Sequence, residues 1–359
     1  MSISPAAQTR IGLVGCGVIA YWAHLRSLPR IRNAKLVAAA DPNENARQRA
    51  KRLVGVPIYE RAEDLFGRND IEAVVICAPT HLHAKLAIAA GAAGKHFYLE
   101  KPIATNAADA ERVIEQARLA PVIGVIGFNR RWHPLYEQAR QLIRDGRIGR
   151  VRAIQTAFCE RIPIDTMPEW KRRRATGGGV LLDLASHHID LLRWFLDDEV
   201  DEVGASVGSE ISEQDSARLE LTTRGGVEVQ SVFSFRAGLA DFFEIIGERG
   251  TLRVDRHAPT LALRIGRRLG YGMRSRWVAP DAAVAKWRLK RLLRPSADPS
   301  YHRSLQAFVA VVRGRQDKVA TLLDGVRSLE VILRAEQSGR SEERIFLQRD
   351  RGGAPCGPY

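Results

Sequence analysis

The sequence has few cysteines and no long apolar stretch, and both shortages restrict what the chain can be. Its four cysteines are scattered without a CxxC pair, at Cys16, Cys77, Cys159 and Cys356. This spacing argues against a disulfide framework and a structural zinc site, so we expect a protein of the reducing cytoplasm. No segment approaches the roughly 18 apolar residues of a membrane-spanning helix, and residues 1–9 lack the charged-then-apolar order of a signal peptide. No membrane partner is therefore expected.

Acidic residues are scarce in one region in particular. The chain of 359 residues carries a net charge of +14, a balance that raises the question of a nucleic-acid partner. Residues 264–294, however, contain ten Lys or Arg and a single acid, Asp281, so much of the basicity belongs to one segment. No recognition-helix pattern accompanies it, and nucleic acid is not the expected partner. The hydrophobic fraction of 45% is that of an ordinary globular protein, and the length suits two domains.

The first third of the chain alternates short apolar runs with helical patterns. Continuous apolar runs predict buried strands at Ile11–Gly15, Leu36–Ala40, Ala73–Ala78, His96–Leu99 and Val122–Ile126. Helical patterns separate them at Val18–Ser27, Asn43–Val54, Thr80–Ala93 and Ala107–Arg118, and Thr80 and Asn106 are predicted N-caps. Repeated strand–helix units predict an α/β domain with a doubly wound parallel sheet, the Rossmann type, over residues 1–128.

The pattern changes after residue 128. Longer segments that alternate polar and apolar residues predict strands, and one amphipathic helix over residues 178–195 interrupts them. We expect residues 129–346 to form an α+β domain with a mostly antiparallel open sheet and helices on one face. Residues 264–294 are expected to be a basic insertion in this domain, and residues 347–359, rich in Gly and Pro, a flexible tail.

A dinucleotide-binding turn follows the first predicted strand. Gly15 permits the tight turn, Gly17 lets the backbone approach a pyrophosphate, and the small Ala20 allows close helix–strand packing; Val18 and Ile19 complete the turn. Asp41 ends the second strand, where a carboxylate binds the ribose hydroxyls of NAD and repels the 2′-phosphate of NADP. NAD is the expected cofactor, with NADP left open because Arg47 lies one turn into the next helix. The alternative is a purely structural turn that binds no cofactor, with Asp41 as an ordinary helix-capping residue.

Two further motifs supply chemistry beside that turn. Lys101, in Glu100-Lys101-Pro102, follows a strand end, where ligands of doubly wound sheets bind, and a desolvated lysine there can carry or relay a proton. Asp183 and His187 stand four residues apart, so they share one helix face and form a candidate acid–base pair in which the carboxylate orients the ring. The alternatives are a surface lysine and a surface ion pair. No third metal ligand has convincing spacing, so no metal is expected.

These motifs together resemble the glucose–fructose oxidoreductase / inositol dehydrogenase / MocA family of NAD(P)-dependent sugar and polyol oxidoreductases. The resemblance extends to about residue 335. Besides the turn and the Glu-Lys-Pro motif it rests on residues 78–83 (APTHLH), 94–96 (GKH), 127–132 (GFNRRW) and the glycine-rich helix that carries Asp183 and His187.

The resemblance implies a role for each motif residue. Lys101 would contact the substrate and the nicotinamide ribose, His187 would be the acid–base group, and Asp183 would bind substrate and assist it. The residues implied to line the cofactor groove are Pro79, Thr80, His83, Glu100 and Asn129. Trp170 matches a tryptophan near the cofactor, although Lys171 follows it where the family often has arginine. Homodimers or homotetramers through the second sheet are also implied.

The expected activity is reversible hydride transfer between a sugar, polyol or nucleotide-sugar hydroxyl carbon and C4 of the nicotinamide. The alternative is a non-catalytic NAD-binding sensor or partner protein on the same scaffold, or binding of an acidic polymer by the basic segment. For residues 264–294 a lid over an anionic substrate and a solvated insertion used in subunit contact remain alternatives.

Overall fold

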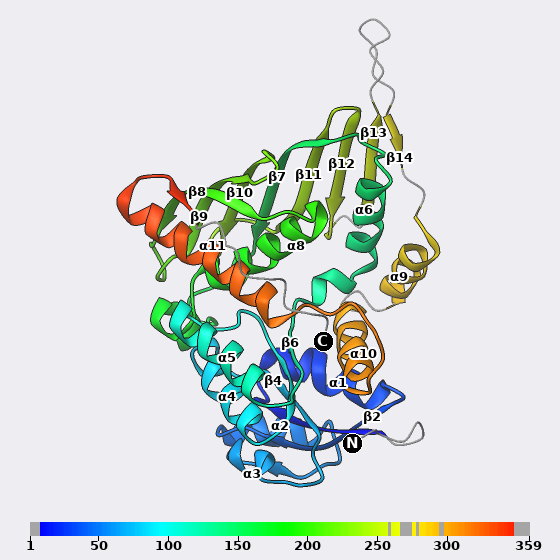
Figure 1. Ribbon diagram of the computed structural model, residues 1–359, viewed down its shortest axis with the longest axis vertical. Helices are drawn as coiled ribbons and strands as arrows, with labels where there is room; N and C mark the ends of the chain where they lie inside the picture. The colour runs from blue at the N-terminus through cyan, green and yellow to red at the C-terminus, as the bar shows by residue number, and fades with distance from the viewer. Residues whose placement is uncertain (1–7, 258–259, 266–274, 278–279, 294–297, 348–359) are drawn as a thin grey trace, which may run out of the picture.

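The computed structural model describes residues 8–257, 260–265, 275–277, 280–293 and 298–347. Two sheets dominate it, a smaller parallel sheet near the N-terminus and a larger sheet beyond it, with helices between and beside them (Figure 1). Within these residues, no helix combines the length and the apolar character that crossing a membrane requires.

The first sheet has six strands in the order β3-β2-β1-β4-β5-β6, all parallel. Its strands are β1 (Thr9–Val14), β2 (Ala34–Ala40), β3 (Ile58–Tyr59), β4 (Ala73–Ile76), β5 (His96–Leu99) and β6 (Gly124–Ile126). The helices between them are α1 (Leu25–Ser27), α2 (Glu44–Lys51), α3 (Glu63–Phe66), α4 (His83–Ala92) and α5 (Ala107–Leu119), with a π-helical turn η1 (Ala20–His24) and a 3₁₀ turn η2 (Leu28–Arg30) before β2. The strand order reverses at β1 and β4, which confirms the predicted doubly wound sheet.

Of the two N-caps predicted for the helices beside this sheet, one is wrong. Asn106 caps α5 by accepting a hydrogen bond from the Asp109 N–H. Thr80 caps nothing, because the chain first makes a 3₁₀ turn, η3 (Thr80–Leu82), and α4 starts only at His83.

The second sheet has nine strands in the order β14-β13-β12-β11-β7-β10-β9-β8-β15. They are β7 (Val151–Cys159), β8 (Val200–Gly208), β9 (Ser216–Thr223), β10 (Glu228–Ser234), β11 (Ala240–Gly247), β12 (Gly250–Asp255), β13 (Thr260–Ile265), β14 (Ser275–Trp277) and β15 (Ile345–Phe346). All its pairings are antiparallel except that of β7 with β10. This confirms the predicted mostly antiparallel sheet.

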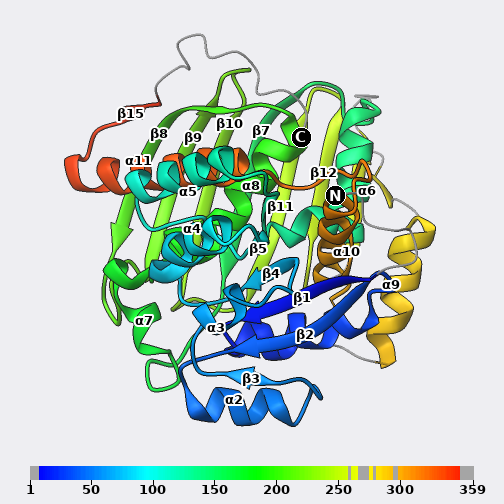
Figure 2. The same cartoon turned by 60° about the horizontal axis from the view of Figure 1, so that its bottom comes forward.

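Helices cover one face of this sheet, as predicted (Figure 2). They include α6 (Pro134–Arg144), α8 (Ser186–Leu196) and the long α11 (Leu322–Ser341), which lies against β8. Along β10, buried and exposed residues alternate, so the other face is open. The homo-oligomer expected through that face stays a prediction, and so do the domain limits at residues 128 and 346.

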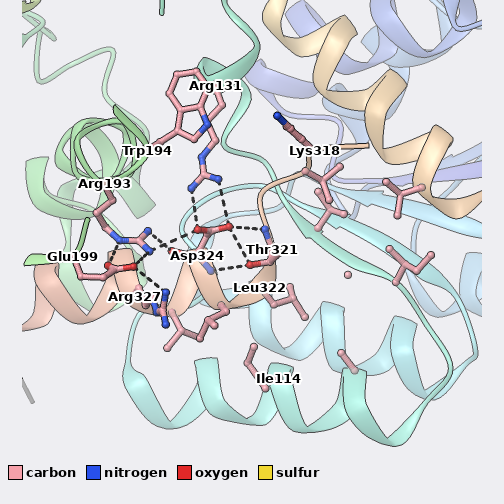
Figure 3. Close-up of a pocket in the computed structure, with 18 of the residues that line it drawn as sticks. Ile114, Arg131, Arg193, Trp194, Glu199, Lys318, Thr321, Leu322, Asp324 and Arg327 are labelled. Atoms are coloured by element: carbon pink, nitrogen blue, oxygen red, sulfur yellow. Dashed lines mark hydrogen bonds and ion pairs between the residues drawn. The ribbon is translucent and has the colours of Figure 1, made fainter. Parts of the chain in front are cut away.

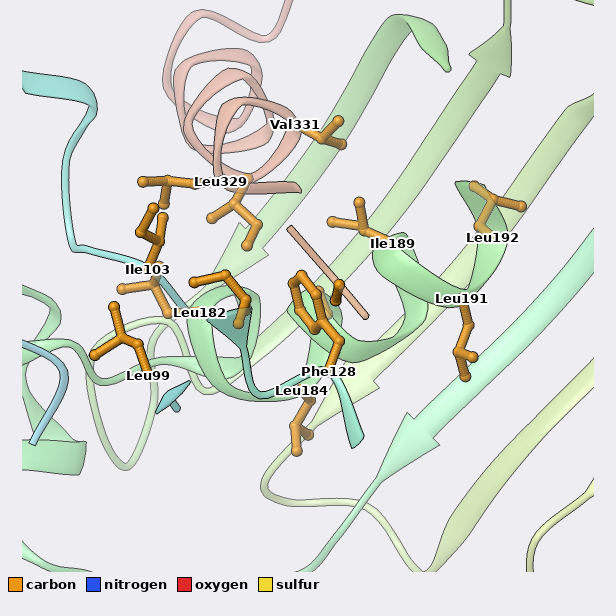
Figure 4. Packing of buried hydrophobic residues seen from close by; sticks show 14 of the residues in the cluster. Leu99, Ile103, Phe128, Leu182, Leu184, Ile189, Leu191, Leu192, Leu329 and Val331 are labelled. Carbon is orange, nitrogen blue, oxygen red and sulfur yellow. The ribbon is translucent and has the colours of Figure 1, made fainter. Parts of the chain in front are cut away.

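A continuous apolar core joins the two sheets (Figure 4). Leu99 is the last residue of β5 and Ile103 lies shortly after it, Leu182 and Leu184 come from the chain leading into α8, and Leu329 comes from α11. Each is at most 3% exposed. Close packing of this kind transmits position rigidly. The end of β5 and the start of α8 are therefore held against each other, and both carry predicted site residues.

The described part of the basic segment contains a helix and also strand residues that the sequence pattern did not predict. Its described residues include the end of β13, the short β14 and the helix α9 (Ala282–Leu293). Val284 and Trp287 bury one side of α9 against α6, where the Trp287 ring lies 4.6 Å from that of His133, while Lys286 and Lys290 are exposed. Residues 266–274 and 278–279 lie outside the described residues. The proposed roles of the segment stay predictions. The expected tail also lies outside the described residues, from 348 onward.

The helix α10 (Ser300–Val312) returns the chain to the first sheet. Leu305, Phe308 and Val309 pack into a core with Ile11 and Leu13 of β1. The apolar core beside the first sheet is therefore completed by residues that come nearly 300 positions later in the chain.

Candidate functional site

The glycine turn after β1 has the geometry that a dinucleotide needs. Gly15 has φ +90°, and a Cβ there would lie 2.7 Å from the carbonyl carbon of Cys77, so no other residue fits. At Gly17 the opposite holds, because no heavy atom of the described residues lies within 4 Å of a Cβ position. Val18, next to it, is exposed. The turn therefore leaves its backbone open to a pyrophosphate.

Asp41 lies beside this turn at the end of β2. Its Oδ2 accepts the Cys16 N–H at 2.6 Å, and its Oδ1 accepts the Asn43 N–H at 2.7 Å. Arg47 donates from Nη1 to the carbonyl oxygens of Asp41 and Pro42, at 2.8 Å each, and pairs with Glu44. Because Arg47 already has these partners, the nearest charge for the adenosine ribose is the Asp41 carboxylate, which suits NAD.

Replacing Asp41 with asparagine is expected to weaken NADH binding by about tenfold or more, because a hydrogen bond to a charged group contributes roughly 1.5–3 kcal/mol. NADPH binding should gain relative to NADH, since repulsion of the 2′-phosphate is lost. Titration by nicotinamide fluorescence measures both affinities. Glu44→Gln is the matched variant, because it removes the ion pair of Arg47 but leaves Asp41 in place. An unchanged NADH/NADPH ratio in Asp41→Asn would contradict the assignment.

Lys101 and Asp183 meet between the two sheets. Lys101 comes two residues after the end of β5. Its ammonium donates to the Asp183 carbonyl oxygen at 2.8 Å and to Asp183 Oδ1 at 3.1 Å. Asp183 lies in a π-helical turn, η6 (Leu181–Ala185), that leads into α8. Such turns are frequent at functional sites. A second ammonium, that of Lys171, lies 2.6 Å from Asp183 Oδ2.

Burial raises the pKa of the Asp183 carboxyl, but the charges and hydrogen bonds of Lys171 and Lys101 outweigh burial and hold it well below its ordinary value. The carboxylate is therefore ionised at neutral pH.

The predicted pairing of Asp183 with the His187 ring is not what the structure has. Both Asp183 oxygens are taken by ammonium groups, which attract a carboxylate more strongly than a neutral ring does. His187 Nδ1 is buried and has no hydrogen-bond partner among the described residues. Burial, together with the positive charges of Lys101, Arg130 and Arg256, lowers the pKa of His187 well below 6.5. The ring is neutral at neutral pH and can accept a proton.

The neighbouring His188 has a different environment. It is fully enclosed, with Nδ1 2.6 Å from Thr156 Oγ1 and Nε2 3.1 Å from Asp241 Oδ1. Asp241 also pairs with Arg130 at 2.9 Å and with Arg256 at 3.4 Å. His188 thus anchors a buried ion network behind His187. In the described part of the chain, no group of three or more His, Cys, Asp or Glu side chains is arranged to hold a metal ion.

Three residues predicted for the cofactor groove make buried polar contacts at the carboxyl ends of the parallel strands. His83 lies between the carbonyl oxygens of Pro102 and Ala78, at 2.7 and 2.9 Å. Glu100 Oε1 lies 2.7 Å from Nε2 of His24, and Asn129 donates to Ser300 Oγ at 2.7 Å. The His24–Glu100 contact joins η1 to the end of β5, and the Asn129–Ser300 contact joins the chain after β6 to α10. Both lie at the edge of the sheet where doubly wound folds bind their ligands.

The remaining predicted groove residues, Pro79, Thr80 and Trp170, lie where the glycine-rich loop before η6 meets the first sheet. A Cβ at Gly177 would lie 2.3 Å from Thr80 Cβ, so glycine allows this close approach. The Trp170 carbonyl accepts the Thr176 hydroxyl at 2.7 Å, and Pro79 directly precedes η3. The structure thus brings these three near one loop, but their contact with a cofactor stays a prediction.

Acid is expected to destabilise this protein from about pH 6.5 downward. Burial lowers the pKa of His133 from 6.5 to about 4. Between these values the unfolded chain binds a proton that the folded chain does not, so stability falls as pH falls, by on the order of 3 kcal/mol from this group. His133→Asn keeps a side chain that can cap α6 and should flatten the pH dependence of urea unfolding between pH 6.5 and 4. A slope equal to that of the wild type would contradict this assignment.

A cavity of about 1240 Å³ lies elsewhere, between α5, the end of α8 and the start of α11 (Figure 3). Its wall holds ion pairs of Arg131 with Asp324 and of Arg193 and Arg327 with Glu199. None of the predicted site residues lines it. We regard its ion pairs as contacts that join the two sheets' helices rather than as part of the candidate active site.

Sequence reasoning missed two residues of this site. Lys171 stood out only as a departure from arginine after Trp170, and nothing local showed that it reaches Asp183. His24 ends the segment Ala20–His24, whose other residues are apolar or aromatic, and this one histidine was the signal available. Both acquire partners only through tertiary contacts.

Comparison with known proteins agrees with this geometry. Residues 9–128 match the oxidoreductase family with an NAD-binding Rossmann fold, and residues 136–253 match the GFO/IDH/MocA C-terminal domain. The chain is 30% identical to myo-inositol 2-dehydrogenase of Thermotoga maritima over 68% of its length and 75% of the relative's. It is 31% identical to a dTDP-3,4-didehydro-2,6-dideoxy-alpha-D-glucose 3-reductase of Actinomadura kijaniata over 70% and 76%.

Solved structures agree as well. The WlbA dehydrogenase of Bordetella pertussis, in complex with NADH and UDP-GlcNAcA, superposes with a TM-score of 0.83 at 25% identity, over 96% of this chain and 99% of that one. Family matches in both halves, a relative at 30% identity and the geometry of the glycine turn lead to one conclusion. The chain belongs to the GFO/IDH/MocA family and is an NAD(P)-dependent oxidoreductase.

Proposed function

We propose that this enzyme oxidises a hydroxyl-bearing carbon of a sugar, polyol or nucleotide sugar, reversibly, with Lys101, Asp183 and His187 as its site residues. The observation that carries the proposal is the Lys101 ammonium, held at 2.8 and 3.1 Å by Asp183 near a histidine whose pKa burial and cations depress. Such a group of residues suits removal of a proton from an alcohol.

The residues divide the work by charge. His187, neutral at working pH, accepts the hydroxyl proton during oxidation and returns it during reduction. The Lys101 ammonium stabilises the negative charge that develops on the substrate oxygen as the proton leaves. Asp183 holds that ammonium in place through two contacts. When bound, NAD accepts the hydride from the same carbon, and Gly15, Gly17 and Asp41 are the residues that would hold it.

The substrate class is supported by the relatives rather than by any residue. One relative is named for myo-inositol, another for a dTDP sugar, and the WlbA complex contains UDP-GlcNAcA. Since one fold serves many substrates, the panel for this enzyme has to include free polyols, free sugars and nucleotide sugars.

The test is to mix the protein with NAD and each member of that panel and to follow the absorbance band of reduced nicotinamide. Reduction of NAD by at least one polyol, sugar or nucleotide sugar supports the proposal. NADH binding without turnover of any panel member, in either direction, would contradict it and favour a non-catalytic NAD-binding protein. Lys85→Met, a charge loss on the exposed side of α4, is the control for handling and stability.

A further inference from the structure

We propose that Lys171 is a positioning residue of this active site: it binds one oxygen of Asp183 and so leaves the Lys101 ammonium with a donor free for the substrate. This inference deepens the proposed function and rests on it. It concerns a side chain to which the sequence pattern assigned no role.

Lys171 is built into the site and is not a mobile surface lysine. It belongs to α7 (Glu169–Arg172), and its side chain is only 17% exposed. Its ammonium lies 2.6 Å from Asp183 Oδ2 and 5.0 Å from the centre of the Phe235 ring. A cation held between a carboxylate and an aromatic face has little freedom to leave.

The backbone around Lys171 is equally constrained. A Cβ at Gly178 would lie 2.2 Å from the Lys171 carbonyl oxygen, so the glycine-rich loop packs directly on α7. Arg172 donates to the Met167 carbonyl oxygen at 3.0 Å, and Thr176 donates to that of Trp170 at 2.7 Å. The distance from Lys171 to Asp183 is therefore set by the fold.

The arrangement has two ammonium groups and one carboxylate. Burial lowers the pKa of Lys171, but the charge and hydrogen bond of Asp183 outweigh it and hold the pKa above its ordinary value. Lys171 is thus a permanent cation. With Lys171 on Oδ2, the Lys101 ammonium contacts, among the described residues, Oδ1 and the Asp183 carbonyl oxygen. An ammonium has three donors, so the third N–H of Lys101 remains for a substrate oxygen.

Removing Lys171 changes this balance. The Asp183 carboxylate then has one cation left, and Lys101 is drawn to both of its oxygens. An ammonium so engaged uses all three of its donors on Asp183 and has none left for a substrate oxygen. Asp183 binds the Lys101 ammonium directly, and His187 and His83 are close enough for its charge to lower their pKa. Glu100 accepts the Lys101 backbone N–H. Lys171 is held by Asp183 and also feels the charge of Glu160.

The first experiment needs neither substrate nor cofactor. The free protein is treated with a small amount of acetic anhydride at fixed pH, and acetylation of Lys101 is quantified by mass spectrometry relative to Lys85. We expect Lys171→Met to slow Lys101 acetylation severalfold, because an ammonium bound by both Asp183 carboxylate oxygens and the Asp183 carbonyl oxygen is less open to the reagent. Lys171→Arg should restore the rate, because it keeps the cation. Arg173→Met, an exposed charge loss two residues away, should leave it unchanged.

The second experiment measures turnover with the best substrate of the panel. Lys171→Met should lower kcat by about 10- to 100-fold, as loss of an orienting contact behind a reacting group does, with KM changed less than threefold and recovery in Lys171→Arg. Equal Lys101 acetylation in the wild type and in a folded Lys171→Met protein would overturn the proposal. If no panel member is turned over, the proposed function fails, but the acetylation result still decides the coupling of Lys171 to Lys101.

Discussion

Replacing His187 with alanine is expected to lower the rate of alcohol oxidation by about a hundredfold to ten-thousandfold, the range in which a general acid–base group contributes. The reason is its environment. Burial and three cations keep the ring neutral, and its Nδ1 is buried without a partner among the described residues, so the other edge of the partly exposed ring is the one able to meet a substrate hydroxyl.

The low pKa of His187 also predicts how kcat/KM for oxidation depends on pH. Because the pKa of His187 lies well below 6.5, the neutral, proton-accepting form persists as the pH falls through 6.5. The kcat/KM for oxidation should therefore stay level through that pH, with its acid limb below it. Unfolding must be followed in parallel by circular dichroism, since acid also weakens the fold. NADH affinity is the control and should change little in His187→Ala. A variant that keeps its fold and a tenth or more of the activity would exclude His187 as the acid–base group.

Replacing Lys101 with methionine is expected to lower kcat and kcat/KM together, by about a hundredfold to a thousandfold, because a preorganised donor at a developing oxyanion contributes on that scale. The fold should survive the change. Asp183 keeps the ammonium of Lys171 at 2.6 Å, so the carboxylate is not left buried without a counter-ion.

We expect Lys101→Met also to shift the pH dependence of kcat/KM. Lys101 is one of the cations that lower the pKa of His187, so its loss should move the acid limb of kcat/KM upward, toward 6.5. Lys101→Met with an unchanged acid limb and near-normal turnover would contradict both the role of Lys101 and its proximity to His187. Lys85→Met should reproduce neither effect.

The Lys101 and Lys171 predictions are coupled through Asp183. Both ammonium groups bind one carboxylate, so the effects of removing them should not add. The double variant is expected to lose little more activity than Lys101→Met alone, because Lys171 acts through Lys101. Additive losses would instead indicate that Lys171 acts on the substrate directly.

Much of the fold was predictable because its signals are local. The apolar runs that contain Ile11 and Ala73 form strands of a parallel sheet whose two faces are both covered by other elements. Gly15 is required because the turn itself needs a φ of +90° at that position. Asp41 was predictable for the same reason, since its place follows from the end of β2. The N-cap predicted at Thr80 was wrong because a 3₁₀ turn, and not α4, begins at that residue. In this turn Thr80 lies against Gly177 of the glycine-rich loop, a tertiary contact that the local sequence does not show.

The partners inside the site were beyond reach of the sequence alone. Asp183 and His187 do lie on consecutive helical turns, η6 and α8, but the four-residue spacing predicted the wrong hydrogen bond. Helical spacing says which side chains share a face, whereas the nearest opposite charge decides what a buried carboxylate binds. That charge came from Lys101, 82 positions away, and from Lys171 on a separate short helix.

By itself, the sequence determined the two kinds of sheet and the dinucleotide turn with its carboxylate, because each depends on periodicity or on the conformation of a few adjacent residues. Only the tertiary structure decided that Asp183 binds two lysines, that His187 is left neutral, and that His24 meets Glu100 across 76 positions. These depend on burial and on distances between charges, which are set when the apolar core brings the end of β5 against the start of α8.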